Sequence, residues 1–248
     1  MLLKEPGNAR CHRLRIVAIF ESDFNHAKKI LMGRKISHHI TDANLLPSMQ
    51  YGSLPGRQCL SASLNKVLMH DYVNLTKTAA AFMENDAISA NVHLVNSVVP
   101  MTLTKLGIPP SVTTCLGAVW DATVHQIKTV YGISDFSYIN SPDRPLFGPG
   151  QGSTCGPGFY TLCYWLMLRS LDPTITTANF PSACKNLFLS LTGTSFVDDT
   201  SLVVTDTTNS LPPSHLVSQL ARLAHHWEKL LFPLAAQFIS RKAIANPD

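Results

Sequence analysis

The chain has 248 residues, of which 45% are hydrophobic and 15% are charged. This composition excludes a disordered protein, and the length allows one large domain or two small ones with a buried core. The formal net charge at pH 7 is only +4, but residues 1–36 carry eight Lys or Arg residues against three acids. A basic arm beside a near-neutral body is typical of proteins that bind phosphates, although a solvated basic surface would have the same composition.

The N-terminal residues MLLKEPGNARCHRLR contain no apolar segment like that of a signal peptide. The longest apolar stretch, Phe159 to Leu168, is too short to span a bilayer. We therefore expect an intracellular protein of the nucleus or cytoplasm that is not secreted and does not contact membranes. The six cysteines are scattered without a CxxC pair, so we expect reduced thiols and no structural zinc.

The first part of the chain has residue patterns typical of both helices and strands. From the N-terminus, the predicted elements are a strand at Leu14–Phe20, a helix at Asp23–Arg34, a loop at 41–58, a helix at Ser61–Thr78 and a strand at Ala79–Met83. Two acids, Glu84 and Asp86, follow that strand directly. A helix at Val92–Leu106 is then predicted to end at Gly107.

The second part begins with a predicted helix at Ser111–His125 and contains two predicted hairpins. The further elements are a hairpin of Ile127–Gly132 and Ser137–Asn140, a Gly-rich loop at Gly148–Gly152, a helix at Gly158–Leu171, a hairpin of Ser195–Val197 and Ser201–Val204, a helix at Ser214–Leu231 and a strand at Gln237–Ala245. Because hairpins are present and no regular βαβ repeat occurs, we expect an α+β fold with a largely antiparallel sheet.

Two adjacent acids, Asp198 and Asp199, interrupt the strand-like run SFVDDTSLVV at residues 195–204. Neighbouring carboxylates repel one another, and their burial costs free energy unless a cation is present. Asp86, at the end of its own apolar strand, is the best candidate for a partner acid from another strand. Mg²⁺ suits such a site because it prefers carboxylate oxygens, waters and substrate phosphates. A solvated turn is the alternative interpretation of the Asp-Asp pair.

Several stretches, in their order along the chain, resemble the reverse transcriptase domain of retroelements, and the resemblance covers nearly the whole sequence. The stretches are MLLKEPGNARCHRLRIV at the N-terminus, MQYGSLPGR (49–57), FMENDA (82–87), LFGPGQGSTCGP (146–157), FVDD (196–199) and FISRKA (238–243). FVDD resembles the Y/F-x-D-D hairpin of the family, and FMENDA resembles the palm strand with the first catalytic Asp. Each motif alone is modest, and their order is the stronger signal.

The resemblance implies a right-hand polymerase palm, with an antiparallel sheet packed on helices, plus fingers and with the thumb absent. Residues 1–78 would form part of the fingers, and residues 79–248 the palm with a fingers insertion at about 107–147. The implied activity is RNA-directed DNA polymerisation, in which two Mg²⁺ ions, with Mn²⁺ as a substitute, assist nucleotidyl transfer. The implied partners are an RNA or DNA template-primer and dNTPs, and no stable protein partner is indicated.

The family motifs also assign roles to acids and to one lysine. Asp86 and Asp198 would be the main metal ligands, with Asp199 as a supporting acid of the same site. Lys242 lies where the family has a Lys after the last palm helix, and it could act as a general acid on the pyrophosphate leaving group. A surface lysine without a catalytic role is the alternative for Lys242.

Phosphate and base-pair contacts are assigned in the same way. Lys4 and Arg15 would neutralise the triphosphate of the incoming nucleotide, because phosphoryl transfer depends on positioning and electrostatics. Arg10 and Arg13 are alternatives to Arg15 in that role. Gly148, Gly150 and Gly152 would let the backbone of the Gly-rich loop approach the nascent base pair, because glycine lacks a Cβ. Gln151 would form a hydrogen bond near the template or the incoming nucleotide, although a plain turn before a helix would also use these glycines.

The sequence departs from the family at three positions. Asn91 stands where the family usually has an aromatic residue that excludes a 2′-hydroxyl, and Val92 stands where relatives often have Asp. Gly156 replaces a usual Ser. These departures leave a second hypothesis open, a catalytically inactive nucleic-acid-binding remnant of a retroelement polymerase. A palm like that of RNA-dependent RNA polymerases is a weaker alternative.

Asn91 generates a prediction about sugar selection. As a small polar residue, asparagine leaves room for a ribose hydroxyl, so we expect weak discrimination against ribonucleotides. Primer extension with dNTPs and with NTPs in parallel measures this selectivity, and strong rejection of NTPs would show that the prediction is wrong.

Overall fold

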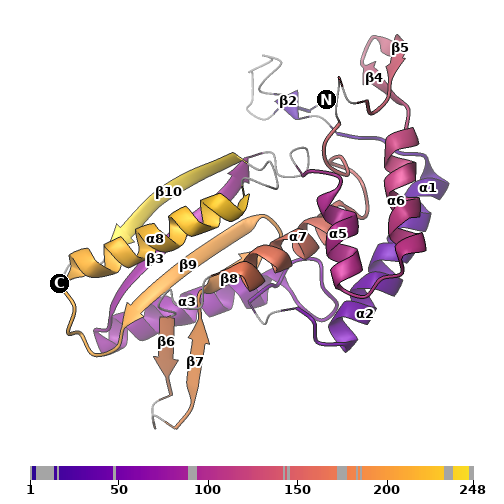
Figure 1. Cartoon of the computed structure of the whole chain (residues 1–248). Coiled ribbons are helices and arrows are strands. Elements are labelled where there is room, and N and C mark those ends of the chain that lie inside the picture. The colour runs from indigo at the N-terminus through magenta and orange to yellow at the C-terminus, as the bar shows by residue number, and fades with distance from the viewer. Residues whose placement is uncertain are drawn as a thin grey trace.

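The structure is a computed structural model in which a four-stranded antiparallel sheet lies between helices (Figure 1). It describes residues 2–3, 14–15, 17–46, 49–88, 94–141, 143, 146–171, 178–182, 184, 186–231 and 237–245. The strand order in the central sheet is β10 (Gln237–Ala245), β3 (Ala79–Ile88), β9 (Asp199–Asp206) and β8 (Gly193–Phe196). All neighbouring strands in this sheet are antiparallel, so the expected α+β class with antiparallel sheets is confirmed.

Alternation along the central strands gives the sheet two apolar faces, because successive side chains point to opposite sides. On one face, Met83 of β3 and Leu202 of β9 belong to the main core cluster. Helix α8 (Pro213–Leu231) contributes to this cluster five apolar residues at helical spacing, namely Leu216, Leu220, Leu223, Trp227 and Leu231. On the other face, Val203 of β9 packs in a second cluster with Met69 and Val73 of α3 (Cys59–Thr76).

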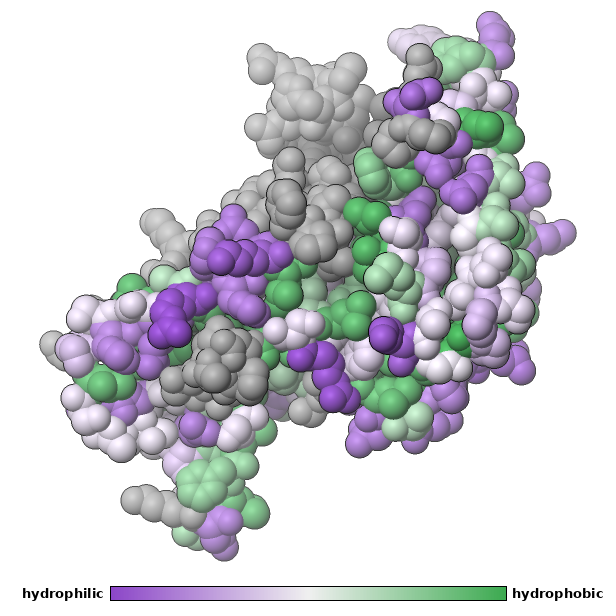
Figure 2. Space-filling model, viewed as in Figure 1, coloured by the Kyte–Doolittle hydropathy of each residue, from purple (hydrophilic) through white to green (hydrophobic). Residues whose placement is uncertain are grey.

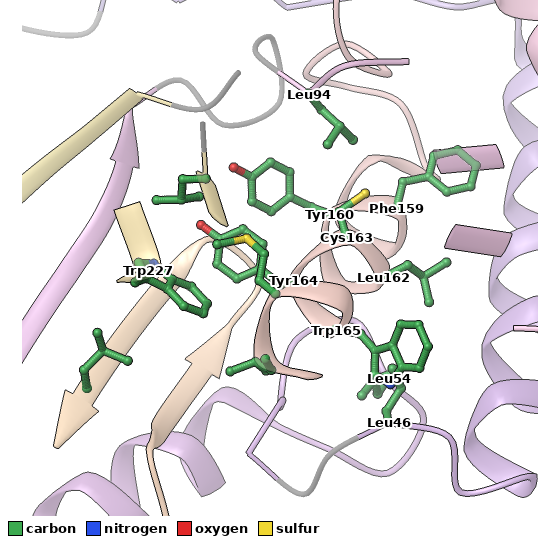
Figure 3. Packing of buried hydrophobic residues seen from close by; sticks show 14 of the residues in the cluster. Leu46, Leu54, Leu94, Phe159, Tyr160, Leu162, Cys163, Tyr164, Trp165 and Trp227 are labelled. Carbon is green, nitrogen blue, oxygen red and sulfur yellow. The ribbon is translucent and has the colours of Figure 1, made fainter. Parts of the chain in front are cut away.

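Helix α7 (Gly156–Ser170) lies at the centre of the main core and is buried on nearly all sides. Figure 3 shows Phe159, Tyr160, Tyr164 and Trp165 extending from it in several directions. Tyr164 meets Trp227 of α8 edge-on, with ring centroids 5.4 Å apart. A helix that is apolar around its circumference is typical of a core helix, so α7 connects the sheet side of the molecule to its N-terminal helices.

The N-terminal helices form one continuous helical segment, which is longer than the predicted helix at Asp23–Arg34. α1 (Ser22–Lys29) continues through a π-helical segment, η2 (Ile30–Ile36), into α2 (Ser37–Asp42). Met32, Ile36 and Ile40 enter the main core from this run. The run packs closely on α7, since a Cβ on Gly158 would lie 2.9 Å from Met32 Cε.

In the part of the chain that the structure describes, the remaining elements are two helices and six strands outside the central sheet. They are β1 (Leu2–Leu3), β2 (Leu14–Arg15), α5 (Val98–Lys105), α6 (Pro110–Ala122), β4 (His125–Thr129), β5 (Gly132–Tyr138), β6 (Ala178–Pro181) and β7 (Phe188–Leu191). β4 and β5 form one hairpin, and β6 and β7 form another. Figure 2 shows hydrophobic side chains on the projecting β6–β7 hairpin, where Leu187 and Phe188 are exposed. No helix among the described residues is both long and apolar enough to cross a bilayer.

Several predicted boundaries were wrong, among them the C-terminal end of β3. The strand continues to Ile88 because both of its edges are paired, one with β9 and the other with β10. Glu84 and Asp86 therefore lie within the strand and not after it. The predicted helix at Val92–Leu106 begins only at Val98, since 94–97 are not helical and 92–93 lie outside the described residues. Similarly, residues 17–20 are not a strand.

Candidate active site

The hairpin of β8 and β9 has a two-residue turn, Val197–Asp198, between the last paired residues Phe196 and Asp199. Val197 has a φ of +58°, a conformation that β-branched residues rarely adopt. A positive φ at the first of two turn residues is the pattern of a type II′ turn, where glycine is usual. The predicted FVDD hairpin is therefore present, with one acid in the turn and the other at the start of β9.

The segment that follows α2 holds this strained turn in place. Gln50 pairs with Ser195 in a parallel bridge, with Tyr51 N donating to Ser195 O at 2.8 Å and Ser195 N donating to Met49 O at 2.9 Å. Gly52 packs against the turn so closely that a Cβ would lie 2.3 Å from Val197 N. Strained backbone persists where the surroundings over-determine it, and functional sites are common locations for it.

Strand pairing brings Asp86 next to the hairpin. The register of β3 and β9 pairs Asn85 with Thr200, and its continuation by one residue places Asp86 opposite Asp199. Phe196 is the partner of Asp199 on the far side, and Ile239 of β10 is the partner of Asp86. The expected neighbour relation between the Asp86 strand and the hairpin is therefore observed, although 112 positions separate Asp86 from Asp198.

The electrostatics of Asp198 reflect this placement. Burial raises the pKa of the Asp198 carboxyl above its usual value, and a hydrogen bond from its own backbone N–H opposes that effect. The negative charges of Asp199 and Asp86 raise the pKa further. The three acids therefore interact electrostatically, and a bound cation would relieve their repulsion.

Two tyrosines of α7 form the apolar side of the site. Tyr164 Oη donates a hydrogen bond to the backbone O of Asp198 at 3.3 Å, and the rings of Tyr160 and Tyr164 lie 4.9 Å apart (Figure 3). Burial raises the pKa of both phenols, and the nearby carboxylates add to the effect. Both tyrosines are therefore neutral at physiological pH, and Tyr164 ties the hairpin tip to the core helix.

A second acid of β3, Glu84, lies on the α3 side of the sheet. Its Oε2 accepts hydrogen bonds from Lys66 Nζ at 2.8 Å and from Ser201 Oγ at 2.7 Å. A cavity of about 250 Å³ opens beside this pair. Its lining residues are Cys59, Ala62, Ser63, Lys66, Glu84, Thr194, Ser195, Phe196 and Asp199. The sequence analysis did not predict a role for Lys66. A lysine on an amphipathic helix usually faces solvent, so its position gave no sign of a partner in the sheet.

The acids match magnesium in the chemistry of their donor atoms. Mg²⁺ is usually bound by one or two carboxylates together with substrate phosphates and waters, and the Asp86 and Asp198 carboxylates meet that requirement as donors. Within the described ranges, however, no three His, Cys, Asp or Glu side chains are grouped so that they could hold a metal ion. The arrangement therefore fits a cation that takes further ligands from substrate, and a cage made by the protein alone is not observed.

The Gly-rich loop packs against the N-terminal segment. Ala18 N donates to Gln151 O at 2.6 Å, and Asn25 Nδ2 donates to Gly152 O at 3.4 Å. Gly150 and Gly152 have positive φ angles, and a Cβ on Gly152 would lie 2.4 Å from Ala18 O. These glycines are thus required by contacts within the protein, whether or not a base pair also approaches them.

Four other residues were predicted to belong to the site, namely Lys4, Arg15, Asn91 and Lys242. Lys4 and Asn91 lie outside the described residues. Arg15 is paired with Leu2 in the small β1–β2 sheet. Lys242 lies in β10 at the register shift between Arg241 and Ile244. The proposed roles of these four residues remain predictions.

Comparison with known proteins identifies the fold only. No protein-family model matches the sequence, and no curated protein matches it. The structure is similar to telomerase from Candida albicans in complex with a TWJ fragment of telomeric RNA, with a TM-score of 0.59 and 14% identity over 91% of this chain. It is also similar to the corresponding complex of telomerase from Candida tropicalis, with a TM-score of 0.54 and 10% identity over 88% of this chain.

The matched region makes up 36% and 35% of those telomerase chains, so this chain spans about a third of their length. Because telomerase is related to reverse transcriptases, the likeness gives the chain a reverse-transcriptase-like fold in coarse outline. At these identities the similarity concerns the fold alone. The likeness to telomerase does not extend to the more specific expectation of a retroelement domain.

Charge at Asp198 generates a prediction for stability. Because the folded-state pKa of Asp198 is raised, ionisation of this group destabilises the fold at pH values above that pKa. We expect Asp198→Asn, without added metal, to increase the unfolding free energy at pH 7. The gain should shrink as the pH falls through the raised pKa toward the ordinary value of 3.8, where the wild-type carboxyl is neutral too.

Asp206→Asn is the matched control because the sign is opposite. Hydrogen bonds from Thr208 Oγ1 and from the N–H of Leu211 lower the pKa of Asp206, so its ionised form stabilises the fold above pH 3.8. Denaturant unfolding of both variants at pH 7 and pH 4 checks these signs. A loss of stability in Asp198→Asn at pH 7 would contradict the cost of the partial burial of Asp198 and of its repulsion by the neighbouring acids.

Proposed function

We propose that this chain is the polymerase domain of an RNA-directed DNA polymerase, which joins dNTPs to the 3′-hydroxyl of a primer on an RNA or DNA template. One observation carries the proposal, the pairing of β3 with β9 that brings Asp86 next to the hairpin with Asp198 and Asp199. A retroelement origin and the division into fingers (1–78) and palm (79–248) belong to the same proposal, and the order of the sequence motifs supports them.

In the proposed reaction, the primer 3′-hydroxyl attacks the α-phosphorus of the dNTP and the bond to pyrophosphate breaks. Two Mg²⁺ ions, when bound, would supply positive charge to the attacking and leaving oxygens. Asp86 and Asp198 would bind the cations, and Asp199 would support them. Lys242 would donate a proton to the departing pyrophosphate.

The surroundings of the acids support a role in binding a charged substrate. Lys4 and Arg15 would neutralise the triphosphate, since positioning and electrostatics dominate phosphoryl transfer. The basic N-terminal arm would also bind nucleic-acid phosphates, in agreement with the RNA present in the two telomerase complexes. Gln151 would contact the template or the incoming nucleotide from the Gly-rich loop.

A second candidate is a nucleic-acid-binding remnant that retains the fold and has lost the chemistry. Asn91, Val92 and Gly156 favour it, because all three depart from the motifs that the rest of the chain resembles. Nucleic-acid binding without metal-dependent turnover would distinguish the remnant from the enzyme.

We expect Mg²⁺-dependent primer extension on an RNA template by the full chain. Asp198→Asn should reduce the rate by on the order of 10²–10³, the usual effect of removing one group that stabilises transition-state charge. Asp135→Asn is the matched control, since Asp135 is an exposed acid in β5. It should extend primers like the unchanged protein.

A binding measurement complements the rate. In the presence of dNTP and Mg²⁺, thermal unfolding of the unchanged protein should shift upward, whereas Asp198→Asn should shift less. Equal extension by both proteins would reject Asp198 as a metal ligand, and tight RNA binding with no extension would favour the remnant.

A further inference from the structure

Lys28 is a buried lysine, with 7% of its surface exposed. It lies on α1, and its Nζ is 3.4 Å from the ring centroid of Phe20 and 4.4 Å from that of Phe24. Aromatic faces attract an ammonium, so the two rings partly compensate for its lost hydration. Sequence motifs assigned no role to this residue.

The buried ammonium has a hydroxyl as its hydrogen-bond acceptor. Lys28 Nζ donates to Ser153 Oγ at 3.1 Å, and Ser153 Oγ lies 3.0 Å from Cys155 Sγ. The ion pairs found within the described ranges do not include Lys28. Burial accordingly lowers the pKa of Lys28. A methionine could pack between two rings without the cost of a buried charge, so the hydrogen bond to Ser153 is the feature that distinguishes lysine here.

The loop that contains Ser153 depends on outside contacts for its shape. Gly148, Gly150 and Gly152 all have positive φ angles. Within the loop, Ser153 N donates to Gly150 O at 3.2 Å, and Gly156 N donates to Ser153 O at 3.1 Å. The other hydrogen bonds that hold it come from segments distant in sequence, chiefly from residues 18–28.

One face of α1 holds three consecutive loop residues. Asn25, one turn before Lys28, donates from Nδ2 to Gly152 O at 3.4 Å. Asn25 also receives hydrogen bonds from Thr154, with Thr154 N to Oδ1 at 3.1 Å and Thr154 Oγ1 to O at 2.7 Å. Lys28 binds Ser153, which lies between these two residues. The helix and the loop are therefore fastened together at 152, 153 and 154.

We propose that Lys28 is a positioning residue for the Gly-rich loop, in which it fixes Ser153 and thereby the place of Gln151 at the nucleotide. The inference rests on the proposed polymerase function for the role of Gln151, and on the contacts above for the hold on the loop. Lys28 acts through Ser153 and does not touch the reacting groups.

The test compares Lys28→Met with Lys29→Met. Both variants remove one lysine charge from α1, but Lys29 is exposed and makes none of these loop contacts. Hydrogen exchange of residues 148–156 in the full chain should be faster in Lys28→Met and unchanged in Lys29→Met. In primer extension, Lys28→Met should raise the KM for dNTP about tenfold, the size of one hydrogen bond to a charged group, with a smaller change in kcat.

Ser153→Ala keeps the inference testable if Lys28→Met does not fold. It should accelerate the same amides, and the double variant should exchange no faster than Ser153→Ala alone, because Ser153→Ala already removes the hydrogen bond between Lys28 and Ser153. Unchanged exchange in Lys28→Met or Ser153→Ala would overturn the inference whatever the activity. If the wild-type protein extends no primer, the result counts against the proposed function. The exchange comparison then still tests whether Lys28 positions the loop.

Discussion

Two carboxylates that are far apart in sequence are held together by backbone hydrogen bonds between two strands. β3 carries Asp86, and β9 begins with Asp199 directly after Asp198 in the turn. The ladder fixes the register, and a slip of one residue would turn every side chain of the strand to the other face. Repulsion among these acids opposes the arrangement, so the surrounding structure must supply the free energy that maintains it.

That free energy comes from packing around the hairpin. Tyr164 of the buried helix α7 binds the turn backbone, and Trp227 of α8 packs on the Tyr164 ring. The segment around Gln50 and Gly52 pairs with β8 and packs beside Val197, and Thr161 of α7 donates a hydrogen bond to Gly52 O. Acids that cost stability within a well-packed scaffold are typical of sites that bind a cation or a charged substrate.

The sequence predicted the parts of the fold that depend on local pattern. The amphipathic helix α8 begins and ends within one residue of the prediction. The β8–β9 hairpin was also predicted, from the β-branched residues on either side of the two acids. The length of β3 was wrong because its extension depends on partners on both edges, which no local pattern reveals. The β6–β7 hairpin was not predicted because its two strands have only four residues each, and the π-helical segment was not predicted because its residues have no pattern that distinguishes it from an α-helix.

The candidate site was predictable to a similar extent. The apolar strand before Asp86 and the motif order both favoured Asp86 as the partner of the Asp-Asp pair, and β3, which carries Asp86, is the neighbour of β9 in the sheet. Glu84, Lys66 and Lys28 were assigned no role, because their partners come from segments distant in sequence. Gly150 and Gly152 were predicted to approach a bound base pair. Their contacts with Ala18 depend on the tertiary structure and were not predictable from the local sequence.

The central claim is that the Asp86 carboxylate lies close enough to Asp198 for its negative charge to raise the pKa of Asp198. Carboxyl NMR titration of Asp198, in the unchanged protein and in Asp86→Asn, measures this directly without any assumption about activity. The pKa of Asp198 should fall in the variant, while part of its elevation persists because burial and Asp199 remain. An identical Asp198 pKa in the two proteins would contradict the convergence of the acids on which the account depends.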